Sequence, residues 1–529
     1  MDISKHLPGR KRNRRGLRRF SPERAKTGWR RQQSIEHLSG AGEKITVATV
    51  AGAMALVLMG LGADLSPRGW IGLGALMLTA QVCFSRYLLD FRRHALKSIG
   101  QVIGLAACLL VPLVVAQIMR EVFEVADFCY LPLSFLSLVI ALAWSRGLAL
   151  DATAYAGGLL AVFLYLRPER DGVLEGWAVS MAGALTACLA ADGIRRRVAV
   201  VRVGLLVGLV QVLVAGAFVL LKQDAPDPSG VSWQMFYLLI DGLVVGLAVS
   251  GALPAIERLF DVTTDVSLLE LGNTHEQPLL RKLLLEAPGT FHHSYIVGLL
   301  SEAAAEACGA NALLTRVGAL YHDIGKLNKP GYFAENSPEA RGRHKGLTPE
   351  MSTLIISSHT RDGVELGMYY GLPKSVLDFM PEHHGTSCIE YFFHSAQALR
   401  GEEHVNEEHF RYPGPRPQSI ETAIVMIADA VEAISRQMPD PSRARLKAMV
   451  HEVVLKRLMD RQFDECGTTL RDLDHIESAC VQVLMGIYHT RPTFPKGRPH
   501  PLDLSQPRED RAAVKDSEEP PTSKTAINS

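Results

Sequence analysis

The sequence predicts an all-α protein in which a polytopic helical membrane domain is followed by a second, all-helical domain. Residues 45–253 are dominated by Leu, Val, Ala and Gly, whereas residues 254–529 have the mixed composition of a soluble domain. The apolar segments of the first part are about 20 residues long, which is the length of a helix that crosses a bilayer. In the second part, polar clusters interrupt apolar sequence of helical character. A chain of 529 residues has room for both domains.

Residues 1–44 form a basic arm that carries 13 Lys and Arg against 4 Asp and Glu. Such an arm could bind nucleic acid or acidic lipid headgroups. Because it directly precedes an apolar segment, we interpret it as a cytoplasmic anchor that follows the positive-inside rule. The formal net charge of the whole chain is only +1, which argues against a nucleic acid polymer as the main partner. The eight cysteines contain no CxxC pair, so we predict neither a disulfide framework nor a zinc framework.

We expect about eight membrane spans. Their ranges are 45–63, 70–89, 98–119, 127–145, 148–166, 173–193, 200–221 and 233–253. The loop charges support this number, because basic and acidic loops alternate along the chain. The basic loops are 86–97, Arg146 and 195–202, and the acidic loops are 120–127 and 222–230. An even number of spans returns the second domain to the side of the basic arm. We therefore predict a multi-pass protein of the cell (inner) membrane with a cytoplasmic C-terminal domain.

Two polar residues, Gln211 and Asp241, lie inside the predicted spans. Polar groups within a membrane are costly and often functional, but Asp241 is equally compatible with a position against a neighbouring helix or nearer the interface. The spans lack the repeated broken-helix pattern of a transporter core. We therefore favour an anchoring or signal-relay role for this domain.

The second domain contains widely separated clusters of histidine and aspartate within apolar helical sequence. They are His292-His293, His322-Asp323, His359, His383-His384 and Asp429. A charged carboxylate on an apolar helix face is unfavourable unless a positive charge compensates it. Neutral imidazoles cannot do so, whereas a divalent ion compensates the carboxylates and uses the imidazole lone pairs. Mixed imidazole and carboxylate ligands without a thiolate suit Fe, Mn, Zn or Co better than a structural zinc.

The order H…HD…H…HH…D resembles that of the HD-domain phosphohydrolases, which are all-helical metal-dependent enzymes. The sequence is most similar in detail to the membrane-anchored seven-transmembrane-receptor HD (7TM-HD) family, which includes cyclic-di-AMP phosphodiesterases. This resemblance extends from about Leu253 to Pro495. Its motifs are "LLEAPGTFHHS", "ALYHDIGKLNKPGYFAEN", "IISSHTRDGVELG", "HHGTS", "FRYPGPRPQ" and "DECGTTLRDLDHI".

The resemblance implies two divalent metal ions, with iron or manganese favoured, and a set of seven ligands. One ion would be held by His293, His322, Asp323 and Asp429. Asp323 would bridge to a second ion held by His359, His383 and His384. His292 would then lie behind the ligands or face solvent. Carbonyl or carboxylate groups are expected to bind the outer nitrogens of the imidazoles and so fix their tautomers.

Several further residues are candidates for catalysis or substrate binding. Lys326 lies one helical turn from His322 and Asp323, so we predict that it contacts a phosphate, although a cation at a helix end is the alternative. By the resemblance, Asp323 and Lys326 are the catalytic candidates. The candidates for the nucleotide pocket, which have weaker support, are Thr386, Tyr391, Arg411 and Tyr412. The last two belong to a Pro/Gly-rich segment that would otherwise be interpreted as an ordinary turn.

The implied activity is hydrolysis of a cyclic dinucleotide second messenger by a membrane-anchored phosphodiesterase. Two metal ions about 3.5–4 Å apart can hold a hydroxide between them and lower the pKa of its parent water from 15.7 towards 7. The chain reads "HHGTSCIEYFFH" and lacks the GYP tripeptide of the HD-GYP enzymes, which act on cyclic-di-GMP. This favours cyclic-di-AMP as the substrate and pApA as the product.

Two alternatives stay open. The first is a transmembrane signalling receptor whose HD domain binds a nucleotide without turnover, and the second is a hydrolase of cyclic-di-GMP. The complete set of seven ligands favours the enzyme over the receptor. A homodimer is a further expectation that the sequence leaves untested.

The expected domains are an arm (1–44), a transmembrane domain (45–253), a helical linker (254–290), an HD domain (291–491) and a disordered tail (492–529). We interpret residues 337–350 as a loop.

Overall fold

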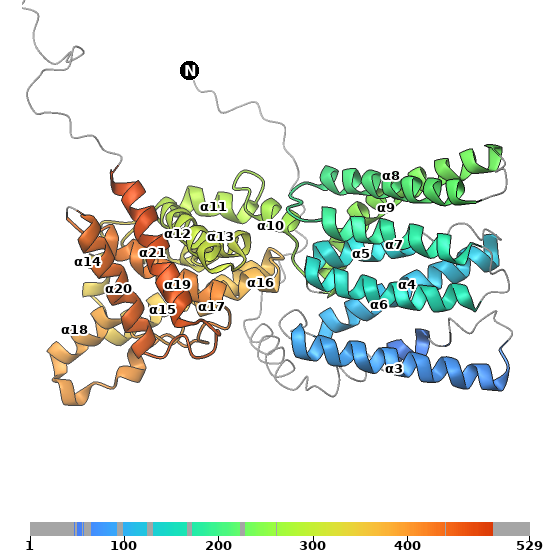
Figure 1. Cartoon of the computed structure of the whole chain (residues 1–529). Coiled ribbons are helices and arrows are strands. Elements are labelled where there is room, and N and C mark those ends of the chain that lie inside the picture. Colours follow the sequence, from blue (N-terminus) through green and yellow to red (C-terminus); the bar gives the residue numbers. More distant parts are fainter. Residues whose placement is uncertain are drawn as a thin grey trace, which may run out of the picture.

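The computed structural model describes residues 65–92, 99–123, 131–166, 172–222, 228–260, 262–439 and 441–489, with scattered positions from 47 to 57. In this part of the chain all secondary structure is helical apart from an isolated bridge between Cys388 and Arg411. The predicted all-α class is therefore confirmed. Figure 1 shows two helical bodies side by side, with α3 to α9 in one and α10 to α21 in the other.

The first body is a bundle of long apolar helices. They are α3 (Pro67–Phe91), α4 (Ile99–Phe123), α5 (Leu131–Ala143), α6 (Arg146–Tyr165), α7 (Val173–Ala190), α8 (Arg197–Leu221) and α9 (Pro228–Phe260). These helices correspond to seven of the eight predicted spans. Five of them, namely α3, α6, α7, α8 and α9, are long and apolar enough to cross a membrane. The first predicted span, the basic arm and residues 490–529 lie wholly or mostly outside the described residues.

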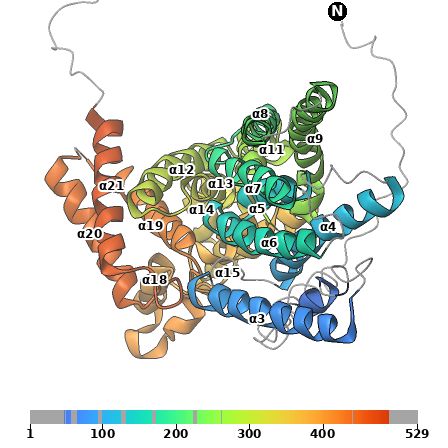
Figure 2. The ribbon, with the colours of Figure 1, turned by 45° about the vertical axis from the view of Figure 1, so that its right-hand side comes forward.

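Helix α5 is the central helix of the bundle. It packs against α4, α6, α7 and α9, and Leu136, Leu138, Val139 and Ile140 are at most 1% exposed. Figure 2 gives a second view of the bundle, in which α8 and α9 lie together at its edge.

Helices α8 and α9 are in backbone contact because glycines face each other across the pair. A Cβ atom on Gly242 would collide with the backbone of Gly204 and Gly208 on α8, and a Cβ atom on Gly246 would lie 2.9 Å from the Cα atom of Val201. Small residues allow close packing of helices in a membrane. This contact fixes α9, whose 33 residues extend over about 50 Å towards the second body.

The short helix α10 (Asp265–Leu271) joins the two bodies. Thr264 caps its first turn in a capping box with Ser267. Val266 belongs to the same hydrophobic cluster as residues of α7, α8 and α9. Leu268 belongs to the cluster that contains Tyr321, and the Tyr321 hydroxyl donates to the Leu271 carbonyl at 2.9 Å. One turn of helix therefore contributes to both hydrophobic cores.

The second body is built from shorter helices. They are α11 (Pro278–Glu286), α12 (Pro288–Cys308), α13 (Ala312–Tyr321), η3 (Ile324–Asn328), η4 (Pro330–Tyr332), α14 (Ala340–Lys345), α15 (Pro349–Tyr369), α16 (Lys374–Leu377), α17 (Phe379–Glu382), α18 (Glu390–Arg400), η5 (Glu402–His404), η6 (Glu407–Phe410), α19 (Ile420–Ser435), α20 (Arg443–Met459) and α21 (Leu470–His489). Helix α19 is the core of this body, because its residues 423–428 are completely buried. The loop expected at 337–350 is wrong in part, since α14 forms there and the Nε2 atom of His344 lies 3.0 Å from the Tyr332 carbonyl oxygen.

Candidate metal centre

The histidine and aspartate clusters converge in the second body. His293 lies in α12, His322 and Asp323 follow α13, His359 lies in α15, His383 and His384 follow α17, and Asp429 lies in α19. Each of these residues is buried except His384, whose side chain is 16% exposed. The close approach depends on Gly325, because a Cβ atom there would collide with the His359 carbonyl group. That glycine lets α15 pack directly against the His322-Asp323 turn.

His293, His322 and Asp429 form one group whose ligand atoms lie within 4.8 Å of one another. The Nε2 atom of His293 is 3.0 Å from Asp429 Oδ1, and the Nε2 atom of His322 is 4.0 Å from the same oxygen. Asp323 Oδ2 faces this group, at 3.6 Å from His293 Nε2 and 3.2 Å from His322 Nε2.

His359, His383 and His384 form a second group of the same kind. The Nε2 atoms of His359 and His383 are 3.3 Å apart, and they lie 3.3 Å and 3.7 Å from Asp323 Oδ1. The two oxygens of Asp323 thus face different groups, as expected of a bridging carboxylate. His384 also approaches the first group, because its Nδ1 atom is 3.5 Å from Asp429 Oδ2.

The outer nitrogen of four imidazoles is occupied. The Nδ1 atoms of His322, His359 and His383 lie 2.6, 2.6 and 3.0 Å from the carbonyl oxygens of Ala319, Ile356 and Phe379. His293 Nδ1 lies 2.5 Å from Glu432 Oε2. Since carbonyl oxygens only accept, the Nδ1 atoms of His322, His359 and His383 carry the proton, and their Nε2 lone pairs point into the site.

Unsatisfied atoms at the centre fit a metal site. His322 Nε2 and both oxygens of Asp323 are buried without a hydrogen bond. Lys326 Nζ lies 2.6 Å from Asp323 Oδ2, but this ion pair lacks the geometry of a hydrogen bond. Buried polar atoms of this kind are rare in folded proteins. The donor set of five imidazoles and two carboxylates suits divalent transition metals.

The pKa values of the buried groups indicate which of them are charged and which are neutral. Burial raises the pKa of Asp323, but the Lys326 ammonium and the surrounding imidazoles outweigh it and hold that pKa well below its usual range. Burial lowers the pKa of His383 to about 3 and lowers that of His384 well below its usual range. His383 and His384 are therefore neutral at pH 7, which is the form that binds a metal.

His293 behaves differently. Burial by itself lowers its pKa, but the contacts with Asp429 and Glu432 outweigh burial and raise the pKa to about 10. Without a metal, this imidazole is protonated at neutral pH and balances part of the negative charge of Asp429 and Glu432.

Lys326 lies at the edge of the centre between two carboxylates. Its Nζ atom is 2.9 Å from Glu335 Oε1 as well as 2.6 Å from Asp323, and it lies 5.0 Å from the centroid of the Phe333 ring. Burial lowers the pKa of Lys326, but Asp323 and Glu335 outweigh it and raise the pKa above its usual value. Lys326 therefore faces the site as a permanent cation. His292, by contrast, is exposed.

Sequence reasoning missed three carboxylates around the centre. Glu432 accepts from His293, and its signal was its position one helical turn after Asp429 in an apolar run. Glu335 holds Lys326. Glu382 directly precedes His383 and accepts from the backbone of Gln418 at 2.9 Å and from the Thr422 hydroxyl at 2.8 Å. Burial raises the pKa of Glu382 to about 7.

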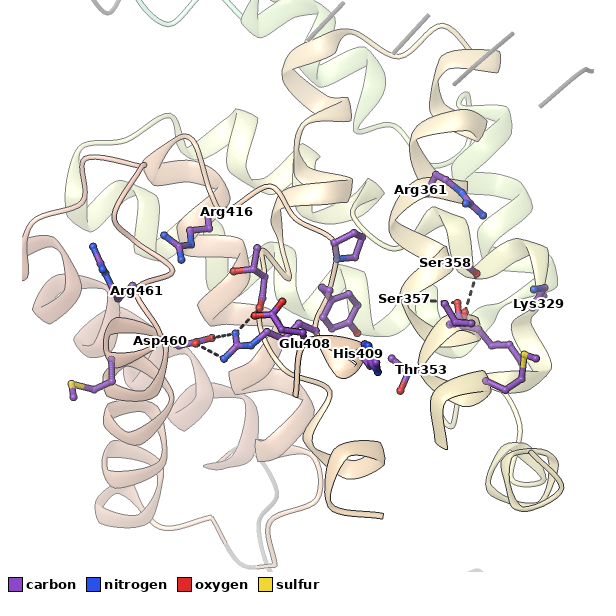
Figure 3. A pocket seen from close by; sticks show the side chains of 18 residues that line it. Lys329, Thr353, Ser357, Ser358, Arg361, Glu408, His409, Arg416, Asp460 and Arg461 are labelled. Carbon is purple, nitrogen blue, oxygen red and sulfur yellow. Dashed lines mark hydrogen bonds and ion pairs between the residues drawn. The ribbon is translucent and has the colours of Figure 1, made fainter. Parts of the chain in front are cut away.

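A cavity of about 1180 Å³ adjoins the metal centre. It opens between α15 and the segment that follows η6, as Figure 3 shows. Tyr412 lines the cavity and stacks on His384, with ring centroids 4.1 Å apart. Its lining contains the basic residues Lys329, Arg361, Arg411, Arg416 and Arg461 and the acidic residues Glu408 and Asp460. The excess of positive charge suits an anionic ligand.

The four candidates for the nucleotide pocket lie in different places. Thr386, Arg411 and Tyr412 line the cavity. Tyr391 is 73% exposed and is not among the lining residues. The Arg411 guanidinium is bound by Asp460 at 3.0 and 3.2 Å, by Glu407 at 2.6 Å and by the Thr386 carbonyl at 2.8 Å. Arg411 therefore supports the wall of the cavity, and its contact with substrate stays a prediction, as does that of the other three.

Comparison with known proteins gives two consecutive family matches. Residues 67–264 match the family described as "7TM receptor with intracellular HD hydrolase", and residues 290–434 match the HD domain. The two matches follow each other in the order of the two helical bodies. The chain thus carries a membrane domain that matches the 7TM-HD family model, followed by an HD domain.

The relatives of this chain include two proteins that are named as phosphodiesterases. The chain is 40% identical over 297 residues to the cyclic-di-AMP phosphodiesterase PgpH of Bacillus subtilis, a match that covers 56% of this chain and 41% of the relative. It is 36% identical over 317 residues to PgpH of Listeria monocytogenes, covering 60% of this chain and 44% of the relative. The chain thus spans less than half the length of these two relatives.

A solved structure was also found, the HD domain of the L. monocytogenes phosphodiesterase PgpH in complex with cyclic-di-AMP. It is 42% identical to this chain, and the match covers 41% of this chain and 100% of the solved one, with a TM-score of 0.39.

Proposed function

We propose that this chain is a membrane-anchored, metal-dependent phosphodiesterase that hydrolyses a cyclic dinucleotide, with cyclic-di-AMP as the substrate and pApA as the product. The observation that carries the proposal is the convergence of seven candidate ligands, some of whose buried atoms are unsatisfied, next to a cavity in whose lining Lys and Arg outnumber Asp and Glu. The two PgpH relatives are named for this activity, and the family is one of HD hydrolases.

The ligands divide between two divalent ions, for which we propose iron or manganese. One ion would be held by His293, His322, Asp323 and Asp429, and the other by Asp323, His359, His383 and His384. When bound, the ions would supply Lewis acidity and lower the pKa of a water, so that hydroxide is available as the nucleophile near neutral pH. The neutral imidazoles preserve that acidity, because they add no negative charge to the ions.

The remaining residues bind and orient the substrate. The hydrolysis cleaves one P–O3′ bond, adds the elements of water, and leaves a 5′-phosphate and a free 3′-hydroxyl. We assign Lys326 to the non-bridging phosphate oxygens, because its ammonium reaches the bridging carboxylate at 2.6 Å and stays protonated at neutral pH. It therefore acts through its charge and not as a base.

The cavity would hold the rest of the dinucleotide. Its volume of about 1180 Å³ slightly exceeds the range for sites that bind small molecules, about 300–1,000 Å³. Tyr412 presents an aromatic face beside His384, and we propose that Lys329 and Arg461 meet the second phosphate from the two sides of the cavity (Figure 3). Thr386 is held at the wall by Gln462, whose Nε2 atom donates to its hydroxyl at 3.0 Å.

The orientation in the membrane is part of the proposal. The basic arm and the basic loops favour a cytoplasmic HD domain by the positive-inside rule, where a second messenger would be available. The domain limits 45–253, 254–290 and 291–491 are proposed from the change in composition along the chain, and their order agrees with that of the two family matches.

Two adjacent histidines provide the test. The full chain in detergent, loaded with Mn²⁺, is incubated with cyclic-di-AMP and, separately, cyclic-di-GMP, and the products are separated by chromatography. We expect turnover of cyclic-di-AMP to pApA by the wild type and by His292→Ala, whose side chain is exposed, but not by His293→Ala. Turnover of neither dinucleotide by the metal-loaded wild type would favour the receptor that binds without hydrolysis. Faster turnover of cyclic-di-GMP would overturn the choice of base.

A further inference from the structure

Four polar side chains from four different helices are buried together inside the membrane bundle. Ser134 on α5, Ser180 on α7, Gln211 on α8 and Asp241 on α9 are exposed by 0%, 1%, 0% and 5%. The two hydroxyls, both amide atoms of Gln211 and both oxygens of Asp241 make no hydrogen bond. Such atoms are costly to bury unless a ligand or another polar group satisfies them.

The packing brings Gln211 and Ser134 together beside α7. A Cβ atom on Gly183 would lie 2.6 Å from Gln211 Nε2 and 2.7 Å from Ser134 Oγ, so the two groups approach each other where α7 has no side chain. Ser180 lies one turn before Gly183 on the same face of α7. Asp241 directly precedes Gly242, which is in backbone contact with Gly208 on α8, one helical turn before Gln211. Neither side chain makes a hydrogen bond.

Asp241 has no ion-pair partner among the described residues, in contrast to Glu175 and Asp151 of the same bundle. Glu175 is 7% exposed and pairs with Lys222 at 2.8 Å. Asp151 pairs with Arg92 at 2.7 Å. Among the described residues, no Lys, Arg or His forms an ion pair with Asp241. A carboxylate at this depth is strongly unfavourable unless a positive charge neutralises it.

We propose that Asp241, Gln211, Ser134 and Ser180 form a binding site for a small monovalent cation such as Na⁺. The site offers two carboxylate oxygens, one amide oxygen and two hydroxyl oxygens, and oxygen ligands of this kind suit hard cations. The single carboxylate balances one positive charge, which favours a monovalent over a divalent ion. The site is separate from the metal centre of the HD domain and differs from it in having no imidazole.

Direct binding of ²²Na⁺ tests this site. The full chain is purified in detergent with the HD centre saturated with Mn²⁺, and Na⁺ replaces choline at constant ionic strength. We expect one saturable Na⁺ per chain and a rise of the thermal unfolding midpoint by a few degrees in Na⁺ relative to choline. Asp241→Asn should abolish both effects. The matched control Glu175→Gln, which removes an equally buried but paired acid, should keep both.

A second variant keeps the test decisive if Asp241→Asn does not fold. Gln211→Leu retains the charge but removes one oxygen ligand, so it should need at least about tenfold more Na⁺ for half-saturation, a change equivalent to about 1.4 kcal/mol. Absence of saturable ²²Na⁺ binding to the wild type, or equal midpoints in Na⁺ and choline, would overturn the proposal and indicate a protonated Asp241. Neither result depends on phosphodiesterase activity, so failure here is distinguishable from failure of the proposed function.

Discussion

Buried carboxylates occur in both halves of the molecule, but their surroundings differ. Asp323 and Asp429 in the HD domain lie among five imidazoles and the Lys326 ammonium, whereas the unsatisfied groups buried in the membrane bundle include the Asp241 carboxylate, one amide and two serine hydroxyls. The first environment holds the pKa of both carboxylates well below its usual range and provides nitrogen ligands for transition metals. The second provides only oxygen ligands. The comparison teaches that the neighbours of a buried acid, and not its burial alone, indicate whether it belongs to an ion site and which ion that site would take.

The halves also differ in what holds them together. The HD domain has a large side-chain core built around α19, whereas α8 and α9 in the bundle pack backbone to backbone through glycines. Helix α10 contributes Val266 to one hydrophobic cluster and Leu268 to the other, and Tyr321, which contacts α10, directly precedes His322. The two halves are therefore in physical continuity at the residue next to the metal centre.

The largest expected effect comes from removing the bridging carboxylate. Asp323→Ala should lower kcat/KM for the cyclic dinucleotide more than about 1,000-fold, which is about 4 kcal/mol, because Asp323 faces both ligand groups. The measurement is pApA formation with Mn²⁺, together with metal content by mass spectrometry. Retention of two Mn²⁺ ions per chain and of activity by this variant would contradict the assignment of Asp323.

Loss of a supporting carboxylate should have a smaller effect on the same site. Glu432→Gln removes the charge that orients His293, so we expect Mn²⁺ affinity to fall about 10–100-fold. Competition with a fluorescent chelator gives the affinity. Glu452→Gln is the control, because Glu452 is exposed and should leave the affinity unchanged. Equal affinities of the two variants would show that Glu432 does not act on the metal centre.

The stability of the membrane bundle should be sensitive to added side-chain volume between α8 and α9, whereas the metal centre should be sensitive to the loss of charged groups. Gly242→Ala inserts a Cβ atom against the backbone of α8, and such overpacking should cost about 1–3 kcal/mol. Gly251→Ala on the same helix meets no atom within 4 Å and should be neutral or slightly stabilising. Thermal unfolding of the two variants in detergent measures the difference. A Gly242→Ala variant as stable as Gly251→Ala would contradict the close packing of α8 and α9.

The smallest expected effect is on proton release. Because the pKa of His293 is raised to about 10 in the metal-free fold, its protonated form stabilises that fold fully below about pH 6.5 and loses this contribution as the pH rises towards 10. Metal binding must displace the proton, so apparent Mn²⁺ affinity should increase with pH between these values. Titration calorimetry in buffers of different ionisation enthalpy should find about one proton released per chain at pH 7.5, and fewer for Glu432→Gln.

Much of the fold class and the ligand set could be predicted from the sequence, because both leave strong local patterns. A membrane helix requires a long apolar segment, and seven of the eight predicted segments are helices in the described part of the chain. The residues His293, His322, Asp323, His359, His383, His384 and Asp429 were singled out together, because imidazole and carboxylate inside apolar helices are unusual without an ion. The structure brings them within bonding reach of common points, and their roles as ligands stay a prediction.

Features that depend on distant partners could not be predicted. Glu335 and Glu432 are 9 and 139 residues away in sequence from Lys326 and His293, and they contact them only in the folded chain. For the same reason the sequence indicated Arg411 as a candidate for the nucleotide pocket but did not indicate that Asp460 binds its guanidinium. Helix α14 was missed because its stability comes from contacts with residues 331 and 332 and not from its own composition.

The central claim is that Asp323 joins two metal sites within one centre. Electron paramagnetic resonance of the full chain loaded with Mn²⁺ tests it most directly, because two Mn²⁺ ions that share a carboxylate are magnetically coupled. We expect the spectrum of a coupled pair in the wild type and isolated Mn²⁺ signals in Asp323→Ala. A six-line spectrum of isolated Mn²⁺ in the fully loaded wild type would contradict the two-metal centre.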